Sequence, residues 1–314
     1  MHDLIIIGAG PAGLAAAAYA IRKRLDVLVI SPDTGGKTNH PFALPWLHDY
    51  QVIRGKEVVS SFKRELEYID FARRREQVNH VDHIAADSTT GGAGGDQFVV
   101  HTLSGDTETG RALIVATGSD RVPLDVPGEL VYLSRGVGYS AISYSHLFID
   151  RTVFLIGNGP RVISSALDLA LHAAHVTVVI ETDGAAPGPA QAERTLLLER
   201  TANVTVLRNA AVREFRGSEY AEAVVITRDD GTEERLHADG FFIEREPIPV
   251  SLPVADLVHL DAHGKIVVDV DCRTSRAGVF AAGDVTNVRS EQVLVALGEG
   301  SKAALSAYDY LLQA

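Results

Sequence analysis

Two stretches of the chain repeat one order of apolar and helical segments. Residues 4–7 (Leu-Ile-Ile-Ile) are uniformly apolar, an Ala- and Leu-rich segment follows, and residues 27–30 are apolar again. The same order returns from residues 152–156 through a helical stretch to residues 176–180. Uniformly apolar strands are typical of parallel sheets that are covered on both faces. The pattern therefore predicts two β-α-β units, one near the N-terminus and one beginning near residue 150.

Apolar and alternating runs predict the remaining elements. Further strands are expected at residues 98–103, 111–115, 204–207, 223–227, 241–243 and 278–284, and a last helix at about 290–312. The first two of these strands alternate like a hairpin, and we interpret the glycine-rich loop 91–95 that precedes them as an exposed turn. The run Arg73-Arg74-Arg75 is expected near a helix end as a solvated face, or alternatively as a docking patch for an acidic electron carrier.

Glycine-rich turns join strand to helix in both units. Gly8, Gly10 and Gly13 form the pattern G-x-G-x-x-G in the strand–turn–helix context that gives it meaning. The first glycine makes the tight turn, the second lets the backbone approach a pyrophosphate, and the third allows close packing of helix on strand. In the second unit, residues 157–162 read Gly-Asn-Gly-Pro-Arg-Val, with Val162 at the third glycine position. Dinucleotide binding and a plain turn both remain open there.

Composition narrows the classes of function. The 314 residues include 29 Lys and Arg against 41 Asp and Glu, a formal net charge of −12 that disfavours nucleic acid and anionic membranes. No apolar run reaches the length of a membrane span. The single cysteine, Cys272, excludes an intrachain disulfide, and we expect a reducing, cytoplasmic setting. The pairs His80/His83 and His172/His175 each lack a third ligand, so we expect no metal site.

Six short motifs, in order and spacing, resemble the low-molecular-weight thioredoxin reductases, which are flavoproteins with two dinucleotide-binding domains. The motifs are residues 8–13, 35–37, 116–119, 136–139, 157–162 and 283–286. The resemblance implies an α/β fold with two Rossmann-like three-layer domains. Residues 1–118 and 248–314 would form a discontinuous FAD domain, and residues 119–247 an inserted NAD(P)-type domain. It also implies a homodimer.

The resemblance places an FAD site on four parts of the chain. Its expected residues are Gly8, Gly10, Pro11, Ala12, Gly13, Ser31, Gly36, Lys37, Thr117, Gly118, Gly283, Asp284, Gln292 and Val293. Asp284 would hold the ribityl chain, and the backbone N–H groups of Gln292 and Val293 would face the flavin ring. Lys37 stands where the family more often has Gln, and Ser31 where many relatives have an acid.

The sequence departs from the family at the redox pair. Where the family has Cys-x-x-Cys, this chain has Ser140 and Ser143, and Tyr144 replaces the acid that normally follows the second cysteine. A hydroxyl neither cycles between thiolate and disulfide nor forms a thiol–flavin adduct. We therefore expect no disulfide reduction and no catalytic side chain at these positions.

The central domain departs at its nucleotide site as well. The expected residues there are Gly157, Asn158, Gly159, Pro160, Arg161 and Glu181. Where the family carries cations for a 2′-phosphate, this chain has Ile180, Glu181 and Thr182, and the glutamate suits a free ribose hydroxyl and repels a 2′-phosphate. Glu244, at a family glycine position, would crowd the nicotinamide side. We expect NADH over NADPH by tenfold or more, a second FAD, or no nucleotide in this pocket.

These observations favour an FAD-dependent oxidoreductase that passes electrons to an acceptor other than a disulfide. The donor would be NADH, a reduced ferredoxin-type protein or a second flavin. Two alternatives remain open: a non-catalytic flavoprotein that serves as redox sensor or scaffold, and an enzyme resembling the NAD(P)H–ferredoxin reductases of this fold. A small redox protein is accordingly a candidate partner.

Overall fold

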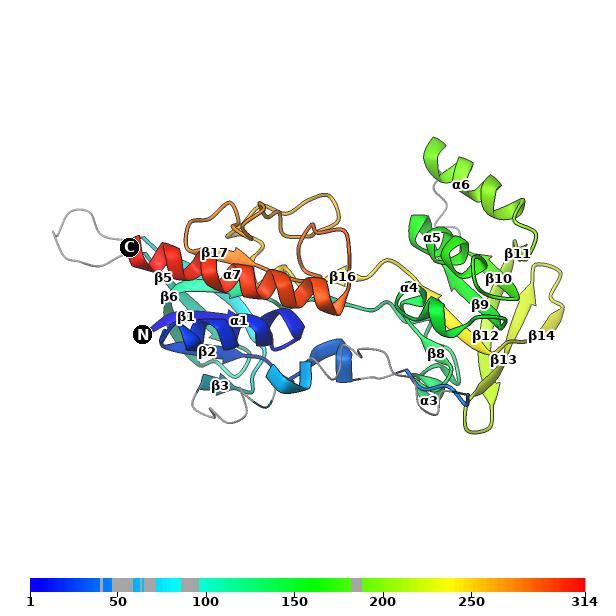
Figure 1. Cartoon of the computed structure of the whole chain (residues 1–314), viewed down its shortest axis with the longest axis horizontal. Coiled ribbons are helices and arrows are strands. Elements are labelled where there is room, and N and C mark those ends of the chain that lie inside the picture. Colours follow the sequence, from blue (N-terminus) through cyan, green and yellow to red (C-terminus); the bar gives the residue numbers. More distant parts are fainter. Residues whose placement is uncertain are drawn as a thin grey trace. The chain divides into compact units, whose positions relative to one another are not determined.

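The computed structural model describes residues 1–39, 42–46, 59–62, 64, 72–85, 96–181 and 188–313. The chain divides into two compact units (Figure 1). The first contains residues 1–39, 52–120 and 248–314, and the second contains residues 40–51 and 121–247. The second unit therefore consists of two segments, each inserted in the sequence of the first.

A seven-stranded mixed sheet organises the first unit, in the order β3-β2-β1-β6-β5-β4 with β17 paired to β6. Its strands are β1 (His2–Ile7), β2 (Val27–Ile30), β3 (Arg73–Arg74), β4 (Val78–Ile84), β5 (Gln97–Thr102), β6 (Thr107–Val115) and β17 (Val279–Ala281). The strands β3, β2, β1, β6 and β17 run parallel, whereas β5 and β4 continue the sheet as an antiparallel hairpin. The parallel strands near the centre are uniformly buried, as their apolar sequences require.

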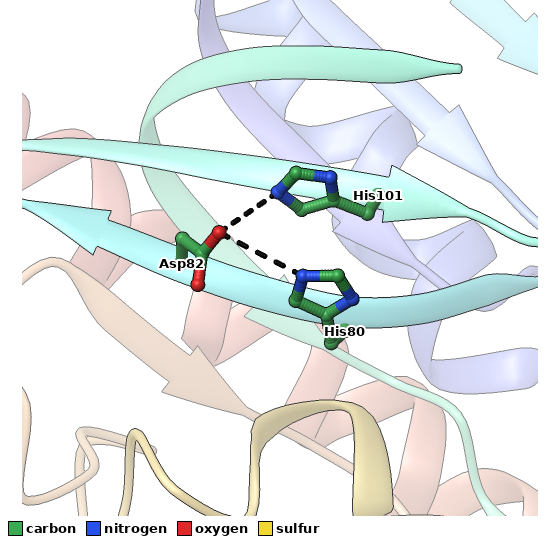
Figure 2. Close-up of side chains that lie close together, drawn as sticks. All are labelled: His80, Asp82 and His101. Atoms are coloured by element: carbon green, nitrogen blue, oxygen red, sulfur yellow. Dashed lines mark hydrogen bonds and ion pairs between the residues drawn. The ribbon is translucent and has the colours of Figure 1, made fainter. Parts of the chain in front are cut away.

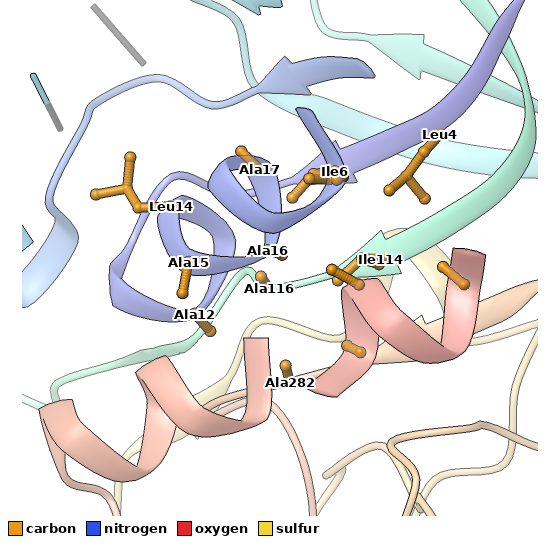
Figure 3. Packing of buried hydrophobic residues seen from close by; sticks show 14 of the residues in the cluster. Leu4, Ile6, Ala12, Leu14, Ala15, Ala16, Ala17, Ile114, Ala116 and Ala282 are labelled. Atoms are coloured by element: carbon orange, nitrogen blue, oxygen red, sulfur yellow. The ribbon is translucent and has the colours of Figure 1, made fainter. Parts of the chain in front are cut away.

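Two helices cover one face of this sheet: α1 (Pro11–Arg22) and α7 (Val293–Gln313). Their contact is made by small residues, because a Cβ atom on Gly300 would lie 2.0 Å from the carbonyl oxygen of Ala12. Figure 3 shows the resulting core, in which the alanines of α1 pack against Leu4, Ile6 and Ile114 of the sheet. The other face is covered by apolar side chains between the short helix η4 (Leu252–Val254) and β17, among them Leu257.

The second unit contains a five-stranded parallel sheet in the order β11-β10-β9-β15-β8. Its strands are β8 (Val137–Gly138), β9 (Thr152–Gly157), β10 (His175–Ile180), β11 (Val204–Leu207) and β15 (Gly240–Glu244). One core lies beneath α5 (Gly159–Ala170), and a second lies beneath an antiparallel three-stranded sheet. The latter sheet comprises β12 (Ala210–Gly217), β13 (Ala221–Arg228) and β14 (Glu233–His237).

Short elements complete the description. They are α3 (Glu129–Tyr132), α4 (Ala141–Tyr144), α6 (Pro189–Glu199), η1 (Gly36–Asn39), η3 (Ser145–Leu147) and the strands β7 (Ser119–Asp120) and β16 (Ile248–Pro249). β7 and β16 pair with each other in antiparallel fashion, and β7 ends and β16 begins at two of the four points where the chain passes between the units. No helix among the described residues is both long and apolar enough to cross a membrane.

The predicted α/β fold with two Rossmann-type domains is confirmed. One local expectation was wrong: Arg73 and Arg74 form the edge strand β3 rather than a helix end. The Arg74 guanidinium is engaged by Glu76, Asp106 and Glu108, so it does not form a free basic patch. The glycine-rich loop 91–95 and Thr182 lie outside the described residues.

Candidate cofactor sites

The first glycine turn is shaped by close backbone contacts. Gly8 has φ +102°, and a Cβ atom there would lie 2.3 Å from the carbonyl oxygen of Ala116. A Cβ atom on Gly13 would lie 1.9 Å from the carbonyl oxygen of Gly8. At Gly10, by contrast, no heavy atom of the described residues lies within 4 Å of the Cβ position. The fold itself therefore requires glycine at two positions and leaves open space at the third, where a pyrophosphate is predicted.

Other predicted FAD residues follow the carboxyl ends of neighbouring parallel strands. Ser31 comes directly after β2, Thr117 and Gly118 follow β6, and Gly283 and Asp284 follow β17. Because the carboxyl ends of parallel strands meet at one edge of a sheet, the fold brings these residues and the β1–α1 turn to the same edge. In open α/β sheets this is the edge where ligands bind.

A lysine-centred cluster lies at this edge. The Lys37 ammonium donates to Asp284 Oδ2 at 2.7 Å and to Ser119 Oγ at 2.8 Å. The Asp284 side chain is 17% exposed and that of Lys37 is 52% exposed. The carboxylate expected to accept ribityl hydroxyls is thus already paired through one oxygen with a cation. The sequence did not predict this pair, because the two residues are 247 positions apart.

A buried acid supports the same loop from behind. The Gly283 N–H donates to Glu299 Oε2 at 2.8 Å, and Glu299 is 8% exposed. Burial raises the pKa of Glu299, while the hydrogen bond from Gly283 acts in the opposite direction. Glu299 therefore fixes the backbone immediately before Asp284.

These residues fit FAD. The start of α1 has no side-chain cap among the described residues, so its first N–H groups can meet a phosphate. Gly118 has φ +73° and, like Gly10, no described heavy atom near its Cβ position. Gln292 and Val293 stand at the first turn of α7. The expected FAD residues thus form one open, polar edge within the first unit, and each assignment to a part of the cofactor remains a prediction.

In the second unit, the two serines at the redox-pair positions contact each other. Ser140 and Ser143 approach to 2.9 Å between their hydroxyl oxygens, with either one donating. Ser143 lies in the single turn of α4, and Ser140 directly precedes it. Tyr144 stacks on Phe42 with ring centroids 4.8 Å apart, and burial raises the pKa of its phenol. The two hydroxyls at the positions expected for the redox pair thus lie within hydrogen-bond distance of each other.

Glu244 is not placed as the sequence suggested. We expected it to crowd the approach to the nicotinamide side, but it is 1% exposed and turned into the protein. Its Oε2 accepts from Arg161 Nε at 2.8 Å, and its Oε1 accepts from the Ala141 N–H at the start of α4. Arg161, an expected nucleotide contact, is thereby committed to a buried carboxylate.

Glu181 is also paired. The Arg245 guanidinium donates to both of its carboxylate oxygens, from Nε at 2.8 Å and from Nη2 at 2.7 Å. This two-pronged geometry is the strong form of an arginine–carboxylate pair. The expected repulsion of a 2′-phosphate assumed a bare carboxylate, and the neighbouring cation offsets it. Sequence reasoning missed Arg245, because its adjacency to Glu181 depends on how β10 and β15 flank β9.

The remaining expected residues of the second nucleotide site surround the start of α5. A Cβ atom on Gly157 would lie 2.1 Å from the Glu244 carbonyl oxygen, so packing alone requires this glycine. Asn158 is the N-cap of α5, with Gly159 (φ +63°) and Pro160 beginning the helix. Asn158 places no side-chain cap hydrogen bond on the helix. Val162 is fully buried in the core beneath α5.

Cys272 stands apart from both sites. It is 3% exposed, has φ +62°, and its Sγ lies 3.6 Å from the Glu299 carbonyl oxygen. Burial raises the pKa of this thiol to about 11. The only thiol in the sequence is therefore a poor nucleophile in the folded protein.

Two glycine turns on two Rossmann-type sheets define a protein with two dinucleotide-binding domains, and comparison with known proteins agrees. A family model described as pyridine nucleotide-disulphide oxidoreductase matches residues 2–300. The chain belongs to this family, whose members are FAD-dependent oxidoreductases that use NAD(P)H.

Individual relatives support this placement. Thioredoxin reductase from Streptococcus pyogenes is 30% identical, with a TM-score of 0.86 and coverage of 100% of this chain and 99% of that one. Thioredoxin reductase from Giardia duodenalis is 26% identical, with a TM-score of 0.84 and 99% coverage of both chains. One subunit of the alkyl hydroperoxide reductase of Pseudomonas putida is 31% identical over 99% of this chain. The chain spans only 58% of that relative's length.

Proposed function

We propose that this chain is an FAD-dependent oxidoreductase that passes electrons to an acceptor other than a disulfide. The observation that carries the proposal is the 2.9 Å contact between Ser140 and Ser143 at the positions of the family's redox pair. Their arrangement preserves the motif but removes its chemistry, since a hydroxyl does not form a disulfide. The chain's single thiol, Cys272, is buried and has a raised pKa, so it offers no substitute.

The residues of the first unit would hold the cofactor. Bound FAD supplies storage for a hydride or for single electrons. Gly10 would give the pyrophosphate access to the backbone at the start of α1, and Asp284 would accept hydrogen bonds from the ribityl hydroxyls. Lys37 donates a hydrogen bond to Asp284 and would place a positive charge beside the cofactor. The N-terminus of α7 offers N–H groups and a positive dipole end to negative charge.

Two classes of electron donor fit the central unit. NADH or NADPH would bind at the start of α5, with the ribose near the Glu181–Arg245 pair. A ferredoxin-type protein is a second candidate, favoured by the internal pairing of Arg161 with Glu244 and of Arg245 with Glu181. These pairs leave two arginines of the central unit already engaged. The homodimer implied by the resemblance remains a prediction.

Anaerobic reduction of the purified protein tests the proposal. The protein is expected to be yellow and to release FAD on denaturation, and one of NADH, NADPH or reduced ferredoxin should bleach the flavin. Thioredoxin and a small disulfide should then be reduced no faster than by free FAD. A colourless protein that takes up no FAD contradicts the cofactor assignment. Disulfide turnover far above free FAD contradicts the assignment of the acceptor.

A further inference from the structure

Three metal-ligating side chains meet on the solvent face of the β4–β5 hairpin, away from the carboxyl edge of the sheet in the first unit. His80 and Asp82 lie two residues apart on β4, so they share a face. His101 of β5 lies directly opposite His80 in the register of the two strands. A register irregularity between Val78 and His80 adjusts the alternation, and the buried residues Val81 and Val100 lie toward the core.

The three donor atoms converge. Asp82 Oδ2 lies 2.9 Å from His101 Nε2 and 3.7 Å from His80 Nε2 (Figure 2). The imidazole rings are parallel within 7°, with centroids 4.1 Å apart. One ligand atom from each residue lies within 4.8 Å of the other two. Ligands placed about 2.0–2.2 Å from one tetrahedral ion are separated by about 3.3–3.6 Å, which is close to these spacings. The two imidazole rings would rotate out of their parallel stack, so that a nitrogen lone pair of each points at the ion.

The chemistry of the set matches a borderline metal ion. Two imidazoles and one carboxylate are ligands that Zn²⁺ and related ions prefer. One divalent ion would join both rings and the carboxylate. The exposed position gives an ion free access, and the net charge of −12 attracts cations.

The second nitrogen of His80 also has a partner. Asn79 Nδ2 lies 3.4 Å from His80 Nδ1. A metal on Nε2 requires the proton on Nδ1, and the Asn79 amide oxygen accepts a hydrogen bond from that Nδ1–H group once the amide oxygen and nitrogen exchange places. Such an outer partner orients a metal-binding imidazole.

We propose that His80, Asp82 and His101 bind a divalent transition-metal ion of the zinc type, with water completing its coordination. The ion would tie the edge strand β4 to β5, its neighbour in the sheet. From the sequence we considered His80 with His83 and expected no metal site; in the structure His83 lies on the opposite face. Its imidazole contacts Asp96 at 3.1 Å and packs near Phe98.

Zinc binding by the tag-free, flavin-loaded protein tests the proposal. After equilibrium dialysis against micromolar ZnCl₂ near neutral pH, the wild-type protein should retain about one zinc ion per chain. His101→Gln and Asp82→Asn should each lower the retained zinc at least tenfold in apparent affinity. His83→Gln is the matched control, because it changes a histidine of the same strand outside the cluster, and it should bind as the wild type does.

A second readout separates binding at the site from damage to the fold. Zinc should raise the thermal unfolding midpoint of the wild-type protein and of His83→Gln, and leave that of His101→Gln unchanged. Circular dichroism and the flavin spectrum establish that each variant is folded. His80→Gln provides an independent variant should one of the others fail to fold. The proposal is overturned if the wild-type chain retains no zinc, or if folded variants of the cluster retain as much zinc as the control.

Discussion

The Glu181–Arg245 pair makes the nucleotide preference of the central unit sensitive to single charges. Changing Arg245→Gln leaves the Glu181 carboxylate bare at the end of β10, next to the expected ribose position. Changing Glu181→Gln removes this carboxylate from the Arg245 guanidinium, which keeps its hydrogen bond to the Pro123 carbonyl oxygen. Both residues are about one quarter exposed, with 27% of the Glu181 side chain and 25% of the Arg245 side chain accessible to solvent. The two variants should therefore shift the preference between NADPH and NADH in opposite directions.

The size of the effect follows from the charges. Two unit charges about 4 Å apart interact by about 4 kcal/mol at an effective dielectric of about 20. Solvent around a partly exposed pair reduces this, and we expect about 1.4 kcal/mol, or about tenfold in affinity, for each variant. Arg245→Gln should disfavour NADPH by about that factor, and Glu181→Gln should favour it. The double variant should return near the wild-type ratio, because both charges are absent.

Stopped-flow reduction of the flavin with each nucleotide measures these ratios. Since NADH and NADPH are compared on the same preparation, loss of folded protein affects both measurements equally. A shift of both single variants in the same direction, or of neither, refutes the placement of the ribose beside this pair. If calorimetry shows that neither NADH nor NADPH binds the wild-type chain, the central unit is not a site for these nucleotides.

Three further outcomes are expected. The double variant Ser140→Cys/Ser143→Cys should form a disulfide on oxidation, because the two hydroxyls are already in contact. Closing a four-residue loop should stabilise the folded protein by about 2 kcal/mol. A count of free thiols that does not fall after oxidation would contradict this. Cys272, with a pKa of about 11, should react with a thiol reagent at about pH 8 some 200-fold more slowly than a free thiol of pKa about 8.5, until the protein is denatured. Burial raises the pKa of Glu299, so the stability that this acid contributes is present below about pH 4.3 and is lost as the pH rises through its folded value. Glu299→Gln should therefore gain stability relative to the wild type with rising pH in urea unfolding, and a constant difference would argue against a raised pKa.

Local patterns were sufficient for the framework of the molecule. The strands at 27–30 and 204–207 are both observed with the predicted bounds. The first is uniformly apolar, and such a short run between turns has few other solutions. Glycine positions were informative where the backbone itself leaves no room for a Cβ atom, as at Gly8 and Gly13. Predicting that the strands are parallel also predicts that their carboxyl ends meet at one edge of the sheet.

Pairings between distant side chains were not accessible in the same way. Lys37 and Asp284 are far apart in sequence, and nothing in their local context identifies them as partners. The cluster on β4 and β5 depends on a register that places His101 opposite His80. Glu244 shows a related difficulty, because its position at a strand end did not reveal that its side chain turns inward. The charge of a residue in the sequence therefore overstates its electrostatic effect wherever a side chain from another strand pairs with it.

The role of Arg161 follows from this last point. A nucleotide pyrophosphate would compete with Glu244 for the Arg161 guanidinium. The Glu244 carboxylate is 1% exposed, burial raises its pKa, and it would lose the cation that favours its ionised form. Breaking a buried pair from one side costs about 3–5 kcal/mol, so Arg161 should remain paired with Glu244, and the backbone N–H groups at the start of α5 should bind the phosphates.

Arg161→Gln is accordingly expected to lower the free energy of unfolding by about 3 kcal/mol or more. The double variant Arg161→Gln/Glu244→Gln should recover much of that loss, since no charge remains buried. Urea unfolding of the single and double variants measures this recovery. Because the backbone is expected to bind the phosphates, the nucleotide affinity of the double variant should change by less than about threefold. A double variant that regains stability yet loses nucleotide binding would show instead that Arg161 contacts the phosphates directly.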